Sequence, residues 1–179
     1  MKFIFGWKGI AVAVAILLAL VGVFINLRVN YKNYYDPFID FEFRLDFDAY
    51  GRSGINTFNN TITKDLVLGG NVVTDYILSE RQRMIIFNKM SDMDIMSYGS
   101  DLNYGVYDFQ HPENLTLIVH IGAEEKTIYW SVPWSFSEEN MKKLSEEQIE
   151  FLELVNYIKR IVYKSKEYKS LPKHVGGYL

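Results

Sequence analysis

The longest run of apolar side chains lies near the amino terminus of the chain. Residues 10–25 read IAVAVAILLALVGVFI and contain no charged or polar side chain. A helix rises about 1.5 Å per residue and the hydrocarbon core of a bilayer is about 30 Å thick, so roughly 20 residues are needed to cross it. Residues 10–27, with Lys8 extending to the headgroups, meet that length. The pattern therefore predicts one transmembrane helix.

The residues on either side of this helix bear on its orientation. Residues 1–9 form a short basic start, but Arg28 and Lys32 follow the helix, so the positive-inside bias is weak. We expect the short start in the cytoplasm, and residues 28–37 as a juxtamembrane stretch on the other side. A cleaved signal peptide is the alternative, but no A-x-A cleavage pattern follows the apolar run.

Small residues recur at every fourth position of the predicted helix, at Ala11, Ala15 and Ala19. Such spacing lets two membrane helices approach closely, which makes a homodimer through this face one hypothesis. Alanine is also common in membrane helices that do not associate.

After the juxtamembrane stretch, the pattern changes to that of an α+β domain. Phe41, Phe43, Leu45 and Phe47 alternate with charged residues, which predicts a half-buried strand over residues 38–48. The same alternation, together with turns that contain glycine, predicts four more strands. These strands cover residues 55–67, 72–78, 115–121 and 126–132.

Two capping boxes predict the starts of two helices. Ser79 with Gln82 opens a helix that should end by Asp92, and Ser145 with Gln148 opens one that should run to about residue 166. The first helix is expected to bury Met84, Ile85, Phe87 and Met90. The second is expected to bury Leu152, Val155, Ile158 and Val162, widened by Phe151, Leu154 and Ile161.

The order of these elements predicts a two-layer α+β domain over residues 38–172. Strands joined by hairpins imply an antiparallel sheet, here of about five strands, and the two amphipathic helices must cover its apolar face. Residues 173–179 are expected to form a short tail.

Composition excludes several classes of function. The chain has no cysteine, so disulfides, thiol catalysis and thiolate metal sites are excluded. All 22 acidic residues follow the apolar run, against 17 of the 19 Lys and Arg, so the part beyond it carries a formal charge near −5. A general nucleic-acid binder would instead show a basic excess.

No motif predicts a catalytic residue, a metal site or a cofactor. His111, His120 and His174 form no metal-binding pattern, and the glycines form no phosphate-binding loop. His120 is expected on the surface of its strand. Acidic residues of the first strand (Asp40, Glu42, Asp46 and Asp48) are expected on a solvated face, since residues two apart on a strand lie about 7 Å apart.

A basic cluster is the one local charge asymmetry of the domain. It consists of Lys159, Arg160, Lys164, Lys166, Lys169 and Lys173. Such a cluster could contact anionic lipid headgroups or an anionic wall polymer. Favourable placement of cations at a helix carboxyl terminus is the simpler explanation, and we favour it.

Aromatic residues offer a second candidate surface. Thirteen Tyr, twelve Phe and three Trp provide ample material for a core. Five of them could instead line a groove for a peptide or glycan, and we favour the core because aromatics carry most of the burial in so small a domain. These five are Tyr98, Tyr104, Tyr107, Trp130 and Trp134.

The layout resembles that of small membrane-anchored or lipid-anchored extracytoplasmic proteins of Gram-positive bacteria. The resemblance rests on the basic start, the apolar helix, the segment YGRSGINTFNNTITKDL, the capped helix that ends near SDMDI, and the final helix before Leu171–Pro172. It implies no catalytic residue. The lipid-attachment cysteine of such proteins is absent, which leaves the helix as the predicted anchor.

These patterns favour a non-enzymatic binding module at the cell envelope, anchored by one helix and lying outside the cytoplasm. Its partner would be a protein or an anionic envelope polymer. An envelope enzyme, or an inhibitor of one, is the alternative, with Asp94, Asp101 and Asp108 of the 92–113 loop as acid and base. An assembly or regulatory subunit that acts through the alanine face is a third hypothesis.

Protease added outside intact cells is expected to digest residues 38–172, because the predicted orientation places the domain outside the membrane. The measurement is the loss of the full-length band on a blot. Protection until the membrane is broken would reverse the orientation and exclude contact with a wall polymer.

Overall fold

The computed structural model describes residues 16–23, 38, 40–103, 113–133 and 141–177. It divides into two compact units, residues 1–39 and 40–179. In the first unit, residues 16–23 are helical. No helix among the described residues is both long and apolar enough to cross a bilayer. Much of the predicted 10–27 helix, including Ala11 and Ala15, lies outside the described residues, so the anchor stays a prediction.

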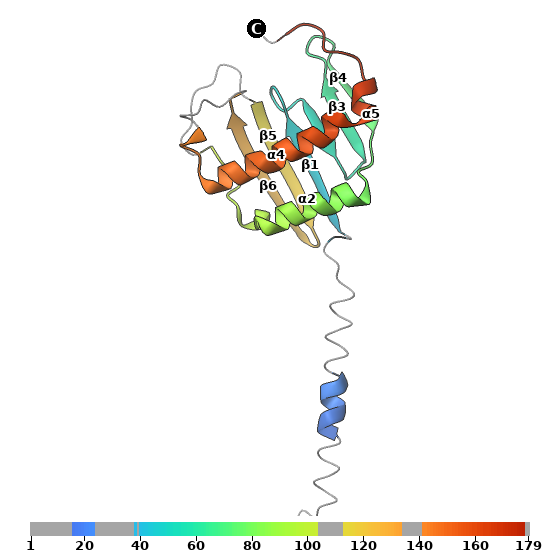
Figure 1. Cartoon of the computed structure of the whole chain (residues 1–179), viewed down its shortest axis with the longest axis vertical. Helices are drawn as coiled ribbons and strands as arrows, with labels where there is room; N and C mark the ends of the chain where they lie inside the picture. Colours follow the sequence, from blue (N-terminus) through green and yellow to red (C-terminus); the bar gives the residue numbers. More distant parts are fainter. Residues whose placement is uncertain (1–15, 24–37, 39, 104–112, 134–140, 178–179) are drawn as a thin grey trace, which may run out of the picture. The chain divides into compact units, whose positions relative to one another are not determined.

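The second unit contains a six-stranded antiparallel sheet, in the order β4-β3-β2-β1-β5-β6 (Figure 1). The strands are β1 (Phe41–Phe47), β2 (Ser53–Asn56), β3 (Thr61–Asp65), β4 (Asn71–Asp75), β5 (Glu113–Ile121) and β6 (Glu124–Val132). The predicted α+β class and antiparallel sheet are confirmed. The predicted count of about five strands was one too low.

The additional strand arises because the stretch predicted as one strand, residues 55–67, folds as β2, a turn and β3. Thr57 causes the break, since its hydroxyl accepts from Phe43 N at 2.7 Å and donates to Phe43 O at 3.0 Å. The Asn56 side chain also accepts from Phe58 N at 3.0 Å, and Asn60 has a left-handed φ of 54°. Polar side chains that bond the backbone locally favour turns over strands. Phe58 lies between the two strands and is 43% exposed.

The apolar side chains of one face of the sheet form one side of the hydrophobic core. Phe41, Phe43, Leu45 and Phe47 of β1 are all 0% exposed, which confirms the alternation seen in the sequence. β1 lies between β2 and β5, and the buried residues of β5 and β6 continue its apolar face. Those residues are Leu115, Leu117, Val119, Ile128, Trp130 and Val132.

Two long helices cover this face (Figure 1): α2 (Glu80–Asp92) and α4 (Glu146–Lys164). Both predicted capping boxes are present at the predicted serines. A short 3-10 helix, η1 (Ile95–Ser97), follows α2. The predicted final helix ends two residues early, because Ser165 is extended and its hydroxyl caps a separate helix, α5 (Lys166–Ser170).

The buried faces of the two helices were predicted with different success. In α4 the buried apolar residues are Phe151, Leu154, Val155, Ile158 and Val162, all of them predicted. Leu152 and Ile161, also predicted as buried, are half-buried. In α2, Ile86 and Met90 are buried, whereas Met84 is 42% exposed. The α2 prediction is therefore confirmed at Met90, is wrong at Met84 and missed Ile86. The apolar residues MII-F follow one another in the sequence and do not define a single face.

The two edges of the sheet differ. The β6 edge is covered by the chain itself, since Leu102 N donates to Tyr129 O and Tyr129 N donates to Ser100 O, both at 2.9 Å. Near the β4 edge, Val175 bonds the β3–β4 loop: its N–H donates to Leu66 O at 3.1 Å and its carbonyl accepts from Leu68 N at 3.2 Å. The predicted tail is thus hydrogen-bonded to the domain at Val175.

Gly54→Ala is expected to destabilise the fold by about 1–3 kcal/mol, the usual cost of overpacking. A Cβ at this position would lie 2.8 Å from Leu45 O and 2.9 Å from Asp46 Oδ1. Gly177→Ala is the matched control, because a Cβ there meets no atom within 4 Å. Denaturant unfolding of the full chain measures both, and equal stabilities would contradict the packing described for β2.

Candidate binding groove between two helices

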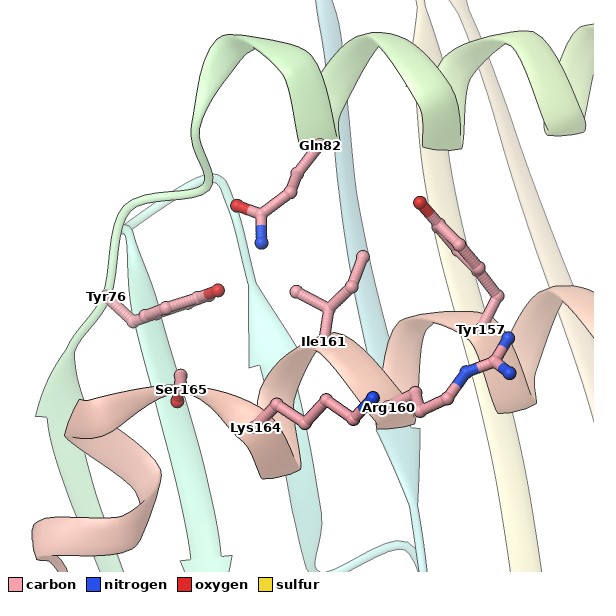
Figure 2. A pocket seen from close by; sticks show the side chains of 7 residues that line it. All are labelled: Tyr76, Gln82, Tyr157, Arg160, Ile161, Lys164 and Ser165. Carbon is pink, nitrogen blue, oxygen red and sulfur yellow. The ribbon is translucent and has the colours of Figure 1, made fainter.

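Two adjoining cavities of about 310 Å³ each lie between α2 and α4. They share Tyr157 and Arg160, and we call them together the groove. The first is lined by Tyr76, Gln82, Tyr157, Arg160, Ile161, Lys164 and Ser165 (Figure 2). The second is lined by Lys89, Glu153, Asn156, Tyr157 and Arg160.

The ring of Tyr157 organises the charged part of the groove. Lys89 Nζ lies 5.2 Å from the ring centroid, and the guanidinium carbon of Arg160 lies 5.7 Å from it. Each cation–π contact of this kind contributes about 0.5–1 kcal/mol at an exposed site. Lys164 follows Arg160 by one helical turn and so lies on the same side of α4. The groove therefore collects a lysine from α2 and two cations from α4.

None of these three cations makes an ion pair within the described part of the chain. The ion pairs of Arg44, Arg83, His120 and Lys159 involve none of them. Glu153 lines the second cavity but is not paired with any of the three. The groove thus presents unneutralised positive charge in a chain whose formal charge is −3.

Tyr76 and Gln82 form the opposite wall of the first cavity, and the Gln82 side chain points from α2 into it (Figure 2). Burial raises the pKa of Tyr76, the charge of Glu167 adds to this rise, and a hydrogen bond with Gln82 acts against it. The hydroxyl is therefore neutral at pH 7. Together with Ile161 of α4, these residues make part of the cavity lining neutral.

Lys159 does not belong to the predicted basic surface. Its Nζ lies 3.2 Å from Asp48 Oδ1 and also pairs with Glu113 Oε1, and only 15% of its side chain is exposed. Tyr163 donates a hydrogen bond to the same Asp48 oxygen at 2.6 Å. Asp48, predicted on the solvated face of β1, reaches this cluster because the strand ends at Phe47 and Asp48 has a left-handed φ of 66°.

The structure divides the remaining basic residues into two groups. Arg160 and Lys164 line the groove, as the preceding paragraphs describe. Lys166, Lys169 and Lys173 are exposed on α5 and the segment after it, and they do not line either cavity. The six residues predicted as one basic cluster therefore lie in three different places. Lys159 is in an ion-paired cluster, Arg160 and Lys164 line the groove, and the other three lysines are exposed on α5 and the segment after it.

The predicted aromatic groove lies only partly within the described residues. Tyr98 is 3% exposed and donates a hydrogen bond to Glu150 at 2.6 Å, and Trp130 is 4% exposed and packs near Phe151. Both side chains are in the core, which leaves little surface to contact a ligand. Tyr104, Tyr107 and Trp134 lie outside the described residues.

The acidic residues predicted for acid–base work do not form a buried pair in the described ranges. Asp94 and Asp101 are exposed, so neither has the burial that acid–base work requires, and Asp101 accepts hydrogen bonds from Asn103 of the same turn. Asp108 lies outside the described residues. No cluster of three or more metal-ligating side chains occurs where the structure is described. His120 is half-exposed and contacts Glu125 and Phe58.

The sequence analysis missed three groove residues: Lys89, Tyr76 and Tyr157. Lys89 belongs to α2, and Tyr157 and Arg160 belong to α4, so only the packing of the two helices brings them together. The one sequence signal was local, since positions 157, 160 and 164 share a helix face.

No family model matches the sequence, and no curated protein or solved structure shows significant similarity to it.

Unfolding of the full chain is expected to become easier as the pH rises above about 10, the usual pKa of tyrosine. Burial, and then the charge of Asp48, raise the pKa of Tyr163 well above this value. Burial also raises the pKa of Tyr168 to about 12. Both groups therefore stay protonated in the folded state while the unfolded chain ionises. The stability is fully present below pH 10 and is lost as the pH rises toward and beyond 12.

Tyr163→Phe tests this dependence, because it removes one of the titrating groups. Denaturant midpoints of the variant should fall less steeply above about pH 10 than those of the unchanged chain. Parallel pH profiles for the two proteins would refute the role given to Tyr163.

Proposed function

We propose that this chain is a membrane-anchored binding module whose groove between α2 and α4 binds an anionic polymer of the cell envelope. One observation carries the proposal: Lys89, Arg160 and Lys164 line the two adjoining cavities of the groove, and no ion pair of the described residues involves them, although Glu153 also lines the second cavity and the chain as a whole is acidic. The proposed function is binding, not catalysis.

The chemistry of the groove suits a phosphate-bearing chain. Lys supplies a point charge, and the planar fork of Arg binds two phosphate oxygens at once. The contact with Tyr157 orients the Arg160 head, so less conformational freedom is lost on binding. The two adjoining cavities, which share Tyr157 and Arg160, form an elongated site that fits successive units of a polymer.

The anchor is supported by the sequence, where residues 10–27 form an apolar run long enough to span a bilayer. A domain held near the outer surface by residues 28–37 would meet polymers of the envelope at high local concentration. Localisation outside the cytoplasm is part of the proposal and is tested by the protease experiment above.

Arg160→Gln with Lys164→Gln is expected to weaken binding of a poly(glycerol phosphate) oligomer by the full chain in neutral detergent. Each cation near a charged surface contributes about 1 kcal/mol. Losing two should therefore weaken binding roughly 30-fold. Calorimetry at low and high salt measures the change, and the difference between proteins should shrink as salt screens the charges.

Lys166→Gln with Lys169→Gln is the matched control, since it removes the same charge from α5, outside the groove. Binding equal to that of the unchanged chain is expected for this control. Equal weakening in both double variants would mean that net charge, and not the groove, governs the interaction. Binding of phosphatidylglycerol vesicles but not of the oligomer would replace the polymer with a lipid surface and overturn the proposal.

A further inference from the structure

The most exposed large apolar side chains of the described domain gather around β4. They are Leu68 (79% exposed), Ile77 (75%), Val73 (58%) and Val175 (56%). Val73 lies within β4, Leu68 precedes the strand, and Ile77 follows it. Val175 is hydrogen-bonded to Leu68. Such a concentration of exposed apolar side chains around one strand marks an interaction site more often than a solvated face.

The backbone of β4 is open along the same edge. Tyr76 N donates to Asn60 O at 2.7 Å, and Leu66 N donates to Gly70 O at 2.8 Å. Both pairs belong to the β3–β4 register, so the hydrogen-bonded pairs between them involve Val72 and Thr74 of β4. The N–H and C=O groups of Asn71, Val73 and Asp75 must then point away from β3.

Nothing in the described part of the chain pairs with these outward-facing groups. The opposite edge of the sheet is different, because residues 100–102 cover β6. Natural edge strands are usually protected by proline, by lysine or by a bulge. β4 reads Asn-Val-Val-Thr-Asp and carries none of these. The fold therefore protects one edge and leaves a hydrogen-bonding strand at the other.

We propose that β4 pairs antiparallel with β4 of a second copy of this chain, with Val73 facing Val73 across a twofold axis. In this register the outward-facing residues of each copy all find partners: Asn71 faces Asp75, Val73 faces Val73 and Asp75 faces Asn71. Each facing pair exchanges two backbone hydrogen bonds. No other register satisfies all three outward-facing residues of both copies.

The charge pattern of β4 favours the same register. Its only charged residue, Asp75, faces a neutral Asn71, whereas a slip that set Asp75 against Asp75 would oppose two like charges. Because β4 is self-complementary in this way, a second copy fits it with no further chemistry required. The proposal does not depend on the groove or on its ligand.

Cysteine crosslinking tests the pairing directly, because the chain has no native cysteine. Facing Cα atoms of a hydrogen-bonded antiparallel pair lie about 5.5 Å apart, within the range of a disulfide. Mild oxidation of full-length Val73→Cys in neutral detergent should convert most of the protein to a disulfide-linked dimer. Thr127→Cys, at an exposed β-branched residue of β6, is the matched control and should stay monomeric on the gel.

Mixed samples test the register. Differently tagged Asn71→Cys and Asp75→Cys chains should link to each other more than either links to itself. Preferential self-linking of Asn71→Cys would overturn the register. Equal crosslinking at Val73→Cys and Thr127→Cys would mean that the copies meet elsewhere, and would overturn the proposal.

Sedimentation of the full chain gives an independent readout. The unchanged protein should have the mass of a dimer, and Val73→Lys should have that of a monomer, since two ammonium groups would face each other at the axis. A dimer that persists in Val73→Lys would assign association to another surface, such as the alanine face of the predicted membrane helix. A monomer in the unchanged chain would also overturn the proposal, and would indicate that another segment covers β4.

Discussion

Burial of the apolar face of β1 beneath two helices is the interaction on which the rest of the domain depends. The four inward side chains of this strand are fully buried, and full burial of one such side chain contributes about 1.5–3 kcal/mol. Phe41 packs edge-on against Phe87 of α2, and Phe47 packs edge-on against Tyr163 of α4. One strand therefore positions both helices. The groove lies between α2 and α4 because both helices pack on the apolar face of β1.

The cluster of Lys159, Asp48 and Glu113 determines the rotation of α4 about its own axis, relative to the sheet. The three side chains are partly buried, and breaking their ion pairs leaves a poorly solvated charge without a partner. The cluster therefore holds one face of the helix toward the ends of β1 and β5. Successive helical residues lie about 100° apart, since a turn takes 3.6 residues. With Lys159 turned inward, Arg160 must point to a different side of the helix, where it meets Tyr157.

The sequence was most informative where a local pattern and a tertiary contact agree. Strict alternation in β1 and the serine–glutamine caps of both helices require only neighbouring residues, and these predictions are confirmed. Periodicity failed at residues 55–67, where Thr57 bonds the backbone of another strand. The sequence also did not distinguish Lys159 from the other lysines near the end of its helix. Its ion-pair partners, Asp48 and Glu113, are distant in the sequence. The groove joins residues of two helices, and no spacing along one of them reveals such a site.

The topology of the sheet also orders the events of folding. β1 to β4 form a meander of chain neighbours, which needs only short loops to close. β1 nevertheless pairs on its other side with β5, where Arg44 meets Ile118, and this contact spans much of the domain. Closing so long a loop is slow, because its entropy must be lost before the contacts form. During synthesis α2 emerges early enough to cover Phe41, but Phe47 remains uncovered until α4 has emerged. This interval is when the new chain is most exposed to aggregation and most in need of a chaperone.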